Sequence, residues 1–199
     1  MTETTANIAV VLATASTIVF LIPQIRKLIT TGDSAGVSTT WAALGLVSNI
    51  GWFVYMFSQA RWIALAAPSF TTIFYAVTLW ALARTGRSLN RGLAIGLGWA
   101  GALSLIAVQG GWTALGVVLG LTYAVMVAPS IWAAYRTPDP SGVSPATWSI
   151  GAIEGMLWGT YGLFHLDPGI ITFGVVQILA SLLILTRYYA TRRPVSQPA

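Results

Sequence analysis

The chain has 199 residues, of which 56 % are hydrophobic and 8 % are charged, and its mean hydropathy is +0.75. Soluble globular domains carry about 25 % charged residues, so most of this surface is not built to face water. The absence of cysteine excludes disulfides and cysteine-based metal sites. The 10 basic residues are scattered between apolar runs rather than gathered into one stripe, so no nucleic-acid partner is expected.

Several apolar segments are long enough to cross a membrane, because a spanning helix needs about 20 mostly apolar residues. Short connections rich in Gly, Pro and Asp separate them, at 31–36, 109–111 and 137–142. The first residues lack a basic region, so no cleaved signal peptide is expected. We predict an all-α integral membrane protein with seven transmembrane helices, at 6–28, 39–58, 62–83, 92–109, 112–135, 146–164 and 168–190.

The basic residues predict the orientation of these spans, because cytoplasmic connections are enriched in Lys and Arg. With the N-terminus outside and the C-terminus in the cytoplasm, Arg61 is the one basic residue in an outer connection. The other nine lie on the cytoplasmic side: Arg26, Lys27, Arg84, Arg87, Arg91, Arg136, Arg187, Arg192 and Arg193. A span count of six or eight would disturb this alternation.

The chain also contains an internal repeat that needs no gaps. A shift of 106 positions places Pro23 on Pro129 and Trp52 on Trp158. The same shift aligns Ile25 with Ile131, Thr31 with Thr137, Asp33 with Asp139, Gly36-Val37-Ser38 with Gly142-Val143-Ser144, Gly45 with Gly151, and Tyr55 with Tyr161. Chance does not produce so many identities in one register, so we expect two related units.

After three spans, the chain is on the opposite side of the membrane from the side where it began. One additional crossing therefore lets a second unit insert in the same orientation as the first. We expect two parallel triple-helix bundles at 6–83 and 112–190, a linker transmembrane helix at 92–109, and a cytoplasmic tail at 191–199. Secondary transporters bind substrate near the midplane between such repeats.

A proline interrupts the first helix of each unit. Proline removes a backbone hydrogen bond and its ring presses on the preceding turn, and in lipid the carbonyl that loses its bond needs another partner within the protein. A kinked packing helix is the alternative, but two kinks at equivalent depth favour hinges. We expect these hinges at Pro23 with Gln24 and at Pro129 with Ser130. The Gln24 amide either satisfies backbone near Pro23 or reaches a cavity.

Glu154 is the most informative single residue, because it lies near the middle of the sixth span. A carboxylate at that depth costs at least about 2.5 kcal/mol on insertion scales, so it should face the interior. It lies four residues before Trp158 and therefore on the same helical face. It would serve as a proton-coupling carboxyl, as a counter-charge for an amine, or as a protonated group that bonds to a neighbouring helix.

Other polar and aromatic side chains complete the predicted site. Ser48 aligns with Glu154 in the repeat, and Asn49 and Gln177 are amides in apolar helices that either bond structurally or contact substrate. Trp52 and Trp158 offer flat faces for a sugar ring or a cation, or else belong to an interfacial belt. Tyr55 and Tyr161, one turn farther out, are candidate gate residues. The remaining tryptophans are expected to face lipid or the interface: Trp41, Trp62, Trp80, Trp99, Trp112, Trp132 and Trp148.

These patterns resemble the PQ-loop superfamily. The resemblance rests on Pro-Gln in the first helix, the Gly-Val-Ser connections, the run Trp-Phe-Val-Tyr in the second helix and the 3-1-3 span count. It covers nearly all of residues 6–190, and the chain is most similar to SWEET sugar transporters and their half-sized SemiSWEET relatives. It implies a substrate cavity between two bundles and alternating access by rocking.

The resemblance also implies roles for single residues. Pro23 and Pro129 match the hinge prolines, and Trp52 and Trp158 match the pair that sandwiches the substrate. SemiSWEETs carry an Asn in the third helix, 16 positions after that Trp. Those positions are occupied here by Pro68 and Gly174, which are therefore expected beside the substrate. The second unit has Ser130 where the family has Gln.

The resulting hypothesis is a carrier for a small polar solute, first a mono- or disaccharide. The alternatives are a proton-coupled carrier for an amino acid, amine or vitamin-like molecule that uses Glu154, and a receptor or scaffold that does not transport. No catalytic set, cofactor or metal site is expected, and His165 is isolated in its connection and predicted to be a surface residue. The lipid bilayer of the cell membrane is the expected surrounding, and association between copies is left open.

Overall fold

The computed structural model describes residues 1–32, 37–138 and 143–191, without the side chains of Phe20, Pro23, Gln24 and Lys27. Over these residues the chain is built from α-helices and short connections, and it contains no strand. The helices are α1 (Glu3–Thr31), α2 (Thr39–Ser58), α3 (Ala66–Arg84), α4 (Asn90–Arg136), α5 (Pro145–Phe164) and α6 (Pro168–Thr191).

The long helix α4 consists of two helices that meet at Gly111. The backbone of Gly111 has φ +72° and ψ −173°. This conformation lies outside the helical region, and residues other than glycine rarely adopt it. The predicted turn at 109–111 is therefore confirmed, and the seven predicted helices are present. Among the described residues, α2, α3, α4 and α6 are long and apolar enough to cross a membrane.

Helix starts follow from the repeated sequence. Ser38 and Ser144, which align in the repeat, lie immediately before α2 and α5, and their hydroxyls accept hydrogen bonds from the backbone N–H groups of Trp41 (3.2 Å) and Thr147 (3.3 Å). Such caps satisfy N–H groups that have no partner in the first helical turn. The recurrence of this serine therefore has a local structural reason.

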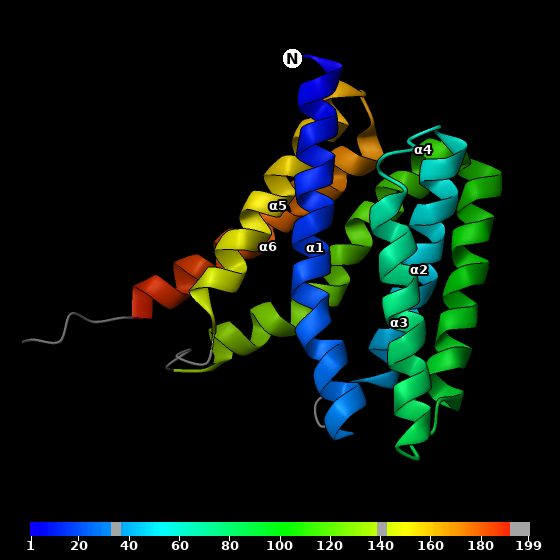
Figure 1. The fold of residues 1–199 in the computed structure, drawn as a ribbon, viewed down its shortest axis with the longest axis vertical. Helices are drawn as coiled ribbons and strands as arrows, with labels where there is room; N and C mark the ends of the chain where they lie inside the picture. Colours follow the sequence, from blue (N-terminus) through cyan, green and yellow to red (C-terminus); the bar gives the residue numbers. More distant parts are fainter. Residues whose placement is uncertain (33–36, 139–142, 192–199) are drawn as a thin grey trace, which may run out of the picture.

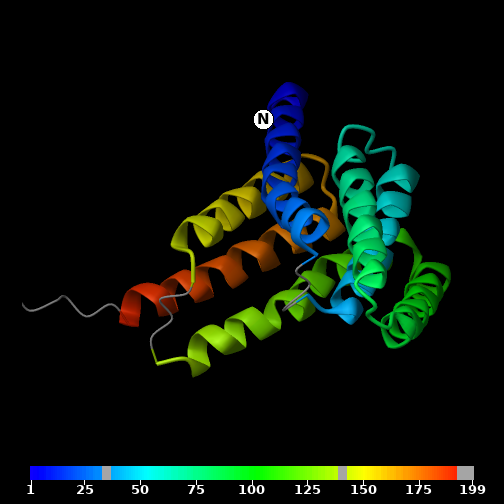
Figure 2. The same ribbon diagram turned by 60° about the horizontal axis from the view of Figure 1, so that its bottom comes forward.

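The six helices form a closed ring in the order α1, α3, α2, α4, α6, α5 and back to α1, because these are the pairs that contact each other. Figures 1 and 2 show that α2, α3 and the first part of α4 run side by side, whereas α5, α6 and the second part of α4 lean away from them. The N-terminus, the α2–α3 connection and the α5–α6 connection share one end (Figure 1), named here the N-terminal end.

Glycines allow the helices to approach closely. A Cβ atom built on Gly155 of α5 would lie 2.9 Å from the Gly174 carbonyl oxygen, and one on Gly174 of α6 would lie 2.7 Å from the Gly155 carbonyl oxygen. Similar contacts join Gly120 of α4 to the backbone of Gly169 and Phe173 on α6. Lipid supplies no hydrophobic drive between helices, so small residues that permit close van der Waals packing hold them together.

We expect Gly174→Ala to destabilise the protein, because the added methyl group meets the backbone of α5 at 2.7 Å. Overpacking costs about 1–3 kcal/mol, which corresponds to a fall in Tm of roughly 2–12 °C for a chain of this size. Thermal unfolding in detergent measures the effect. Gly98→Ala is the matched control, since a Cβ there meets nothing within 4 Å, and an equal fall in both variants would contradict the packing argument.

Candidate functional site

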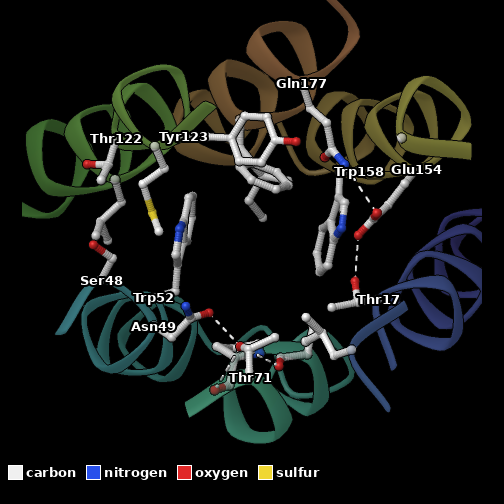
Figure 3. A pocket seen from close by; sticks show the side chains of 18 of the residues that line it. Thr17, Ser48, Asn49, Trp52, Thr71, Thr122, Tyr123, Glu154, Trp158 and Gln177 are labelled. Carbon is white, nitrogen blue, oxygen red and sulfur yellow. Dashed lines mark hydrogen bonds between the residues drawn. The ribbon is translucent and has the colours of Figure 1, made fainter. Parts of the chain in front are cut away.

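A pocket of about 450 Å³ lies inside the ring of helices, and all six helices contribute to its wall. Pockets of 300–1,000 Å³ are usual for small-molecule ligands. Every α4 residue that lines the pocket follows the break at Gly111, so the first part of α4 stays outside the site. Figure 3 shows the lining side chains pointing inward from the surrounding helices.

The two predicted tryptophans line this pocket. Trp52 of α2 and Trp158 of α5 lie on opposite sides of it (Figure 3). Phe173 of α6 contacts both edge-on, with ring centroids 5.8 Å from Trp52 and 6.1 Å from Trp158. Tyr123 of α4 contacts Phe173 at 5.4 Å. These four rings make an aromatic wall on which a flat or ring-shaped solute would stack.

Glu154 also lines the pocket, with 9 % of its surface exposed. Its carboxyl accepts a hydrogen bond from the Thr17 hydroxyl at 2.5 Å and another from the Gln177 amide nitrogen at 3.1 Å. Gln177 is 3 % exposed, and its amide oxygen has no partner among the described residues. No Arg, Lys or His belongs to the described lining, and Glu154 is the one carboxylic acid among these residues.

The opposite wall is polar but neutral. The Asn49 amide donates to the Gly45 carbonyl at 2.8 Å and accepts from the Thr71 hydroxyl at 2.5 Å. Ser48 is buried, and its hydroxyl accepts a hydrogen bond from the Trp99 indole at 3.0 Å. Since Trp99 belongs to the first part of α4, that segment positions a pocket residue without lining the pocket itself.

Several lining residues repeat in the same register as the sequence. The pairs separated by 106 positions in which both members line the pocket are Thr17 and Tyr123, Ser48 and Glu154, Trp52 and Trp158, Ala67 and Phe173, and Thr71 and Gln177. Equivalent positions therefore face one cavity, although the chemistry of the paired side chains differs.

A polar cluster joins the connections at the N-terminal end. Asp167 is 4 % exposed and accepts hydrogen bonds from the Tyr55 hydroxyl at 2.6 Å and from the Ile170 backbone N–H at 3.1 Å. Arg61 lies 3.6 Å from the Asp167 carboxylate, measured from Nε to Oδ2. The cluster ties the α2–α3 connection to the start of α6, and the side chains of Tyr55, Arg61 and Asp167 do not line the pocket.

His165 belongs to the same cluster. Its Nδ1 atom lies 2.9 Å from an Arg61 guanidinium nitrogen, and Arg61 also donates to the His165 carbonyl at 3.3 Å. Burial lowers the pKa of His165, and the positive charge of Arg61 lowers it further, whereas Asp167 and Glu3 act in the opposite direction. The prediction that His165 is an isolated surface residue is therefore wrong, because a charged neighbour binds it.

Of the other residues predicted for the site, one lines the pocket and three are buried outside it. Pro68 lines the pocket, whereas Gly174 is buried against α5 and is not among the lining residues. Tyr55 and Tyr161 are each 2 % exposed and lie beyond the pocket at the N-terminal end. The ring of Tyr161 packs against that of His165, with centroids 4.5 Å apart.

Two of the predicted hinge residues, Pro129 and Ser130, do not line the pocket. Pro129 and Ser130 are exposed, and α4 remains helical through both to Arg136. The side chains of Pro23 and Gln24 lie outside the described residues, although α1 runs through these positions from Glu3 to Thr31. The hinges remain predictions.

Sequence reasoning missed several residues of the site. Trp148 lines the pocket and Trp99 bonds to Ser48, so the expectation that both face lipid or the interface is wrong. The contact between Arg61 and Asp167 was not predicted, although these residues are 106 positions apart and therefore align in the repeat. Extending the alignment to residue 167 would have paired them. No group of three or more potential metal ligands occurs in the part of the chain that the structure describes.

We expect Arg61→Gln to raise the pKa of His165, because it removes a positive charge that opposes protonation of the imidazole. The chain has a single histidine, so an NMR titration of its ring signals is unambiguous. Arg61→Lys retains the charge and should leave the pKa closer to that of the parent chain. An unchanged or lower pKa in Arg61→Gln would contradict the described contact.

Two comparisons with known proteins bear on this site. Residues 5–65 match the family model for the PQ loop repeat, which spans α1, α2 and the connection that carries Arg61. No curated protein matches the chain at a significant level. The matched segment supplies Thr17, Ser48, Asn49 and Trp52 to the pocket. The match shows that residues 5–65 are similar to a PQ loop repeat, and the four apolar helices of spanning length are consistent with an integral membrane protein.

Proposed function

We propose that the protein is a carrier that moves a small polar solute across the membrane by alternating access. In this proposal two PQ-loop repeats form parallel triple-helix bundles, α1–α3 and the second part of α4 with α5 and α6. The first part of α4 is the linker, which gives a 3-1-3 arrangement. The shared register of the lining residues supports this division, because equivalent positions of two repeats face one cavity.

The unequal ends of the molecule support alternating access. At the N-terminal end, Tyr55 and Arg61 from the first repeat bind Asp167 from the second. Toward the opposite end, α5 and α6 diverge from α1–α3 (Figures 1 and 2). Rocking of the two bundles would break the cluster at the N-terminal end and bring the other ends together. Tyr55 then acts as a gate residue, with Tyr161 beside it, and Pro23 and Pro129 are the proposed hinges.

The solute is proposed to be a mono- or disaccharide. The single observation that carries this proposal is the position of Trp52 and Trp158, which face each other across the pocket (Figure 3). Sugar rings present C–H faces that stack on indoles, and their hydroxyl groups need polar partners. Asn49, Thr71 and Gln177 supply such partners on the pocket wall.

A solute that carries an amine is the second candidate. Glu154 has no cationic partner among the described residues of the pocket, and the Gln177 oxygen beside it has no hydrogen-bond donor. A protonated amine would supply both the charge and the donors, and the aromatic wall would stabilise it further. The membrane is proposed to be the cell membrane, with the N-terminus outside.

We expect Trp52→Ala and Trp158→Ala to lower uptake at least about tenfold, because an aromatic stack contributes about 0.5–1.5 kcal/mol beyond the buried area that is lost with it. Uptake into proteoliposomes is measured with a panel of labelled glucose, sucrose and small amines. Trp112→Ala is the control, since Trp112 is exposed and does not line the pocket. Solute binding without uptake would indicate a receptor, and equal loss in all three variants would contradict a role in stacking.

A further inference from the structure

The carboxyl of Glu154 lines the pocket, although a neutral solute that stacks on the tryptophans does not need a carboxyl there. The carboxyl lies within a span, yet no basic side chain belongs to the described lining of its pocket. Three neutral groups surround it instead: the Thr17 hydroxyl from α1, the Gln177 amide from α6 and the Trp158 side chain from α5. Neutral donors can hold a carboxylate, but they do not fix its charge as an arginine would.

The hydrogen bonds of Thr17 allow both protonation states of Glu154. The Thr17 hydroxyl lies 2.5 Å from the Glu154 carboxyl and 3.1 Å from the Ala13 carbonyl, and it has one hydrogen to donate. When Glu154 is ionised, Thr17 donates to the carboxylate. When Glu154 is protonated, the carboxyl donates to Thr17, and Thr17 donates to Ala13. No buried hydroxyl loses its partner in either state, so a proton can be gained or lost without repacking.

The hydrogen bond between Thr17 and Glu154 joins two helices that move relative to each other in the proposed carrier. Thr17 belongs to α1 and Glu154 to α5, and these helices contact each other directly. In the proposed carrier, that contact joins the two bundles and has to change during rocking. Glu154 also contacts Trp158, one turn along α5, whose ring lines the pocket. One carboxyl therefore touches both the inter-bundle contact and the surface on which the solute stacks.

The repeat shows that this carboxyl has no counterpart. The residue equivalent to Glu154 is Ser48, which is bound by Trp99. The other titratable groups in the described lining are Tyr75 and Tyr123, and tyrosine does not ordinarily ionise near neutral pH. Among the side chains of α1 and α6 that the structure describes, none that lines the pocket is charged. A single proton site is the consequence.

We propose that Glu154 binds and releases one proton in each transport cycle, so that the chain is a proton-coupled carrier. This inference rests on the proposed function. The proton comes from water in the pocket when the pocket is open to one side, and it returns to water on the other side. Protonation forms the O–H bond of the carboxyl as one O–H bond of a hydronium ion breaks, and release to water reverses this exchange. In the ionised form Thr17 holds α1 to α5 through the carboxylate, and protonation weakens that charge-assisted bond.

The first test follows the conformation and needs no solute. Ser88→Cys and Thr137→Cys place two cysteines in exposed connections at the end opposite the N-terminal cluster. Because the chain has no native cysteine, spin labels react only at these two positions. Distances between the labels are measured in liposomes from pH 5 to pH 8. We expect the distribution to shift with pH in the parent chain and to stay at its low-pH form in Glu154→Gln.

Matched controls separate this carboxyl from other titrating groups. Glu3→Gln makes the same chemical change at an exposed residue and should retain the pH response. Thr17→Val keeps the carboxyl but removes its partner on α1, and it should move the midpoint of the response. A pH response that persists in Glu154→Gln, or no response in the parent chain, would overturn the inference. Thermal unfolding of each variant confirms that it is folded.

The second test measures flux of labelled glucose and sucrose into proteoliposomes with and without an imposed pH gradient. One proton per solute allows up to about tenfold accumulation for each unit of gradient. We expect accumulation in the parent chain and only equilibration in Glu154→Gln. Equilibration of a sugar in both chains would overturn the coupling and leave the carrier intact. The absence of sugar flux would contradict sugar as the solute, and the label distances would still decide the role of Glu154.

Discussion

Lipid offers no hydrogen-bond partners, and this constraint governs where the polar side chains of the protein lie. Most hydroxyls inside the spans bond to their own helix. Thr14, Thr78 and Thr122 each donate to the carbonyl four residues earlier at 2.8 Å. Hydrogen bonds between different helices are formed instead around the central pocket and toward the two ends of the molecule, where Asp167 accepts from Tyr55 at the N-terminal end and Arg187 of α6 donates to the Ala134 carbonyl of α4 at the other. These interhelical bonds define the part of the molecule that is not simply an apolar bundle.

The ring of helices explains how the pocket coexists with tight packing. Neighbouring helices approach through glycines, as at Gly155 and Gly174, so their backbones pack closely at the perimeter. Large aromatic side chains point toward the centre, where Phe173 contacts Trp52 and Trp158 edge-on. Small residues between helices and large residues around the cavity thus produce a rigid wall with a solute-sized interior.

The two segments of the sequence that align at a spacing of 106 positions share a register but differ in chemistry. Trp52 and Trp158 are identical, whereas Ser48 faces Glu154 in the alignment and Thr71 faces Gln177. Opposite charges occupy the equivalent connections, and Arg61 and Asp167 bind each other across the N-terminal end. An exact repeat would place like charges there, which would repel. Differences between positions 106 residues apart therefore supply both the ion pair at the N-terminal end and the one carboxyl among the described lining residues of the pocket.

The sequence by itself determined the seven helices, because apolar segments of spanning length and connections of Gly, Pro and Ser are local properties. It also indicated Trp52, Trp158 and Glu154 through their spacing within one helix and across the repeat. Only the tertiary structure decided that Thr17 meets Glu154 and that Trp99 turns inward to Ser48. In lipid the outer and inner faces of a helix are similarly apolar, so hydrophobic periodicity does not reveal which face meets which neighbour. Those contacts depend on how side chains from distant segments fit together, and that fit exists only in the folded chain.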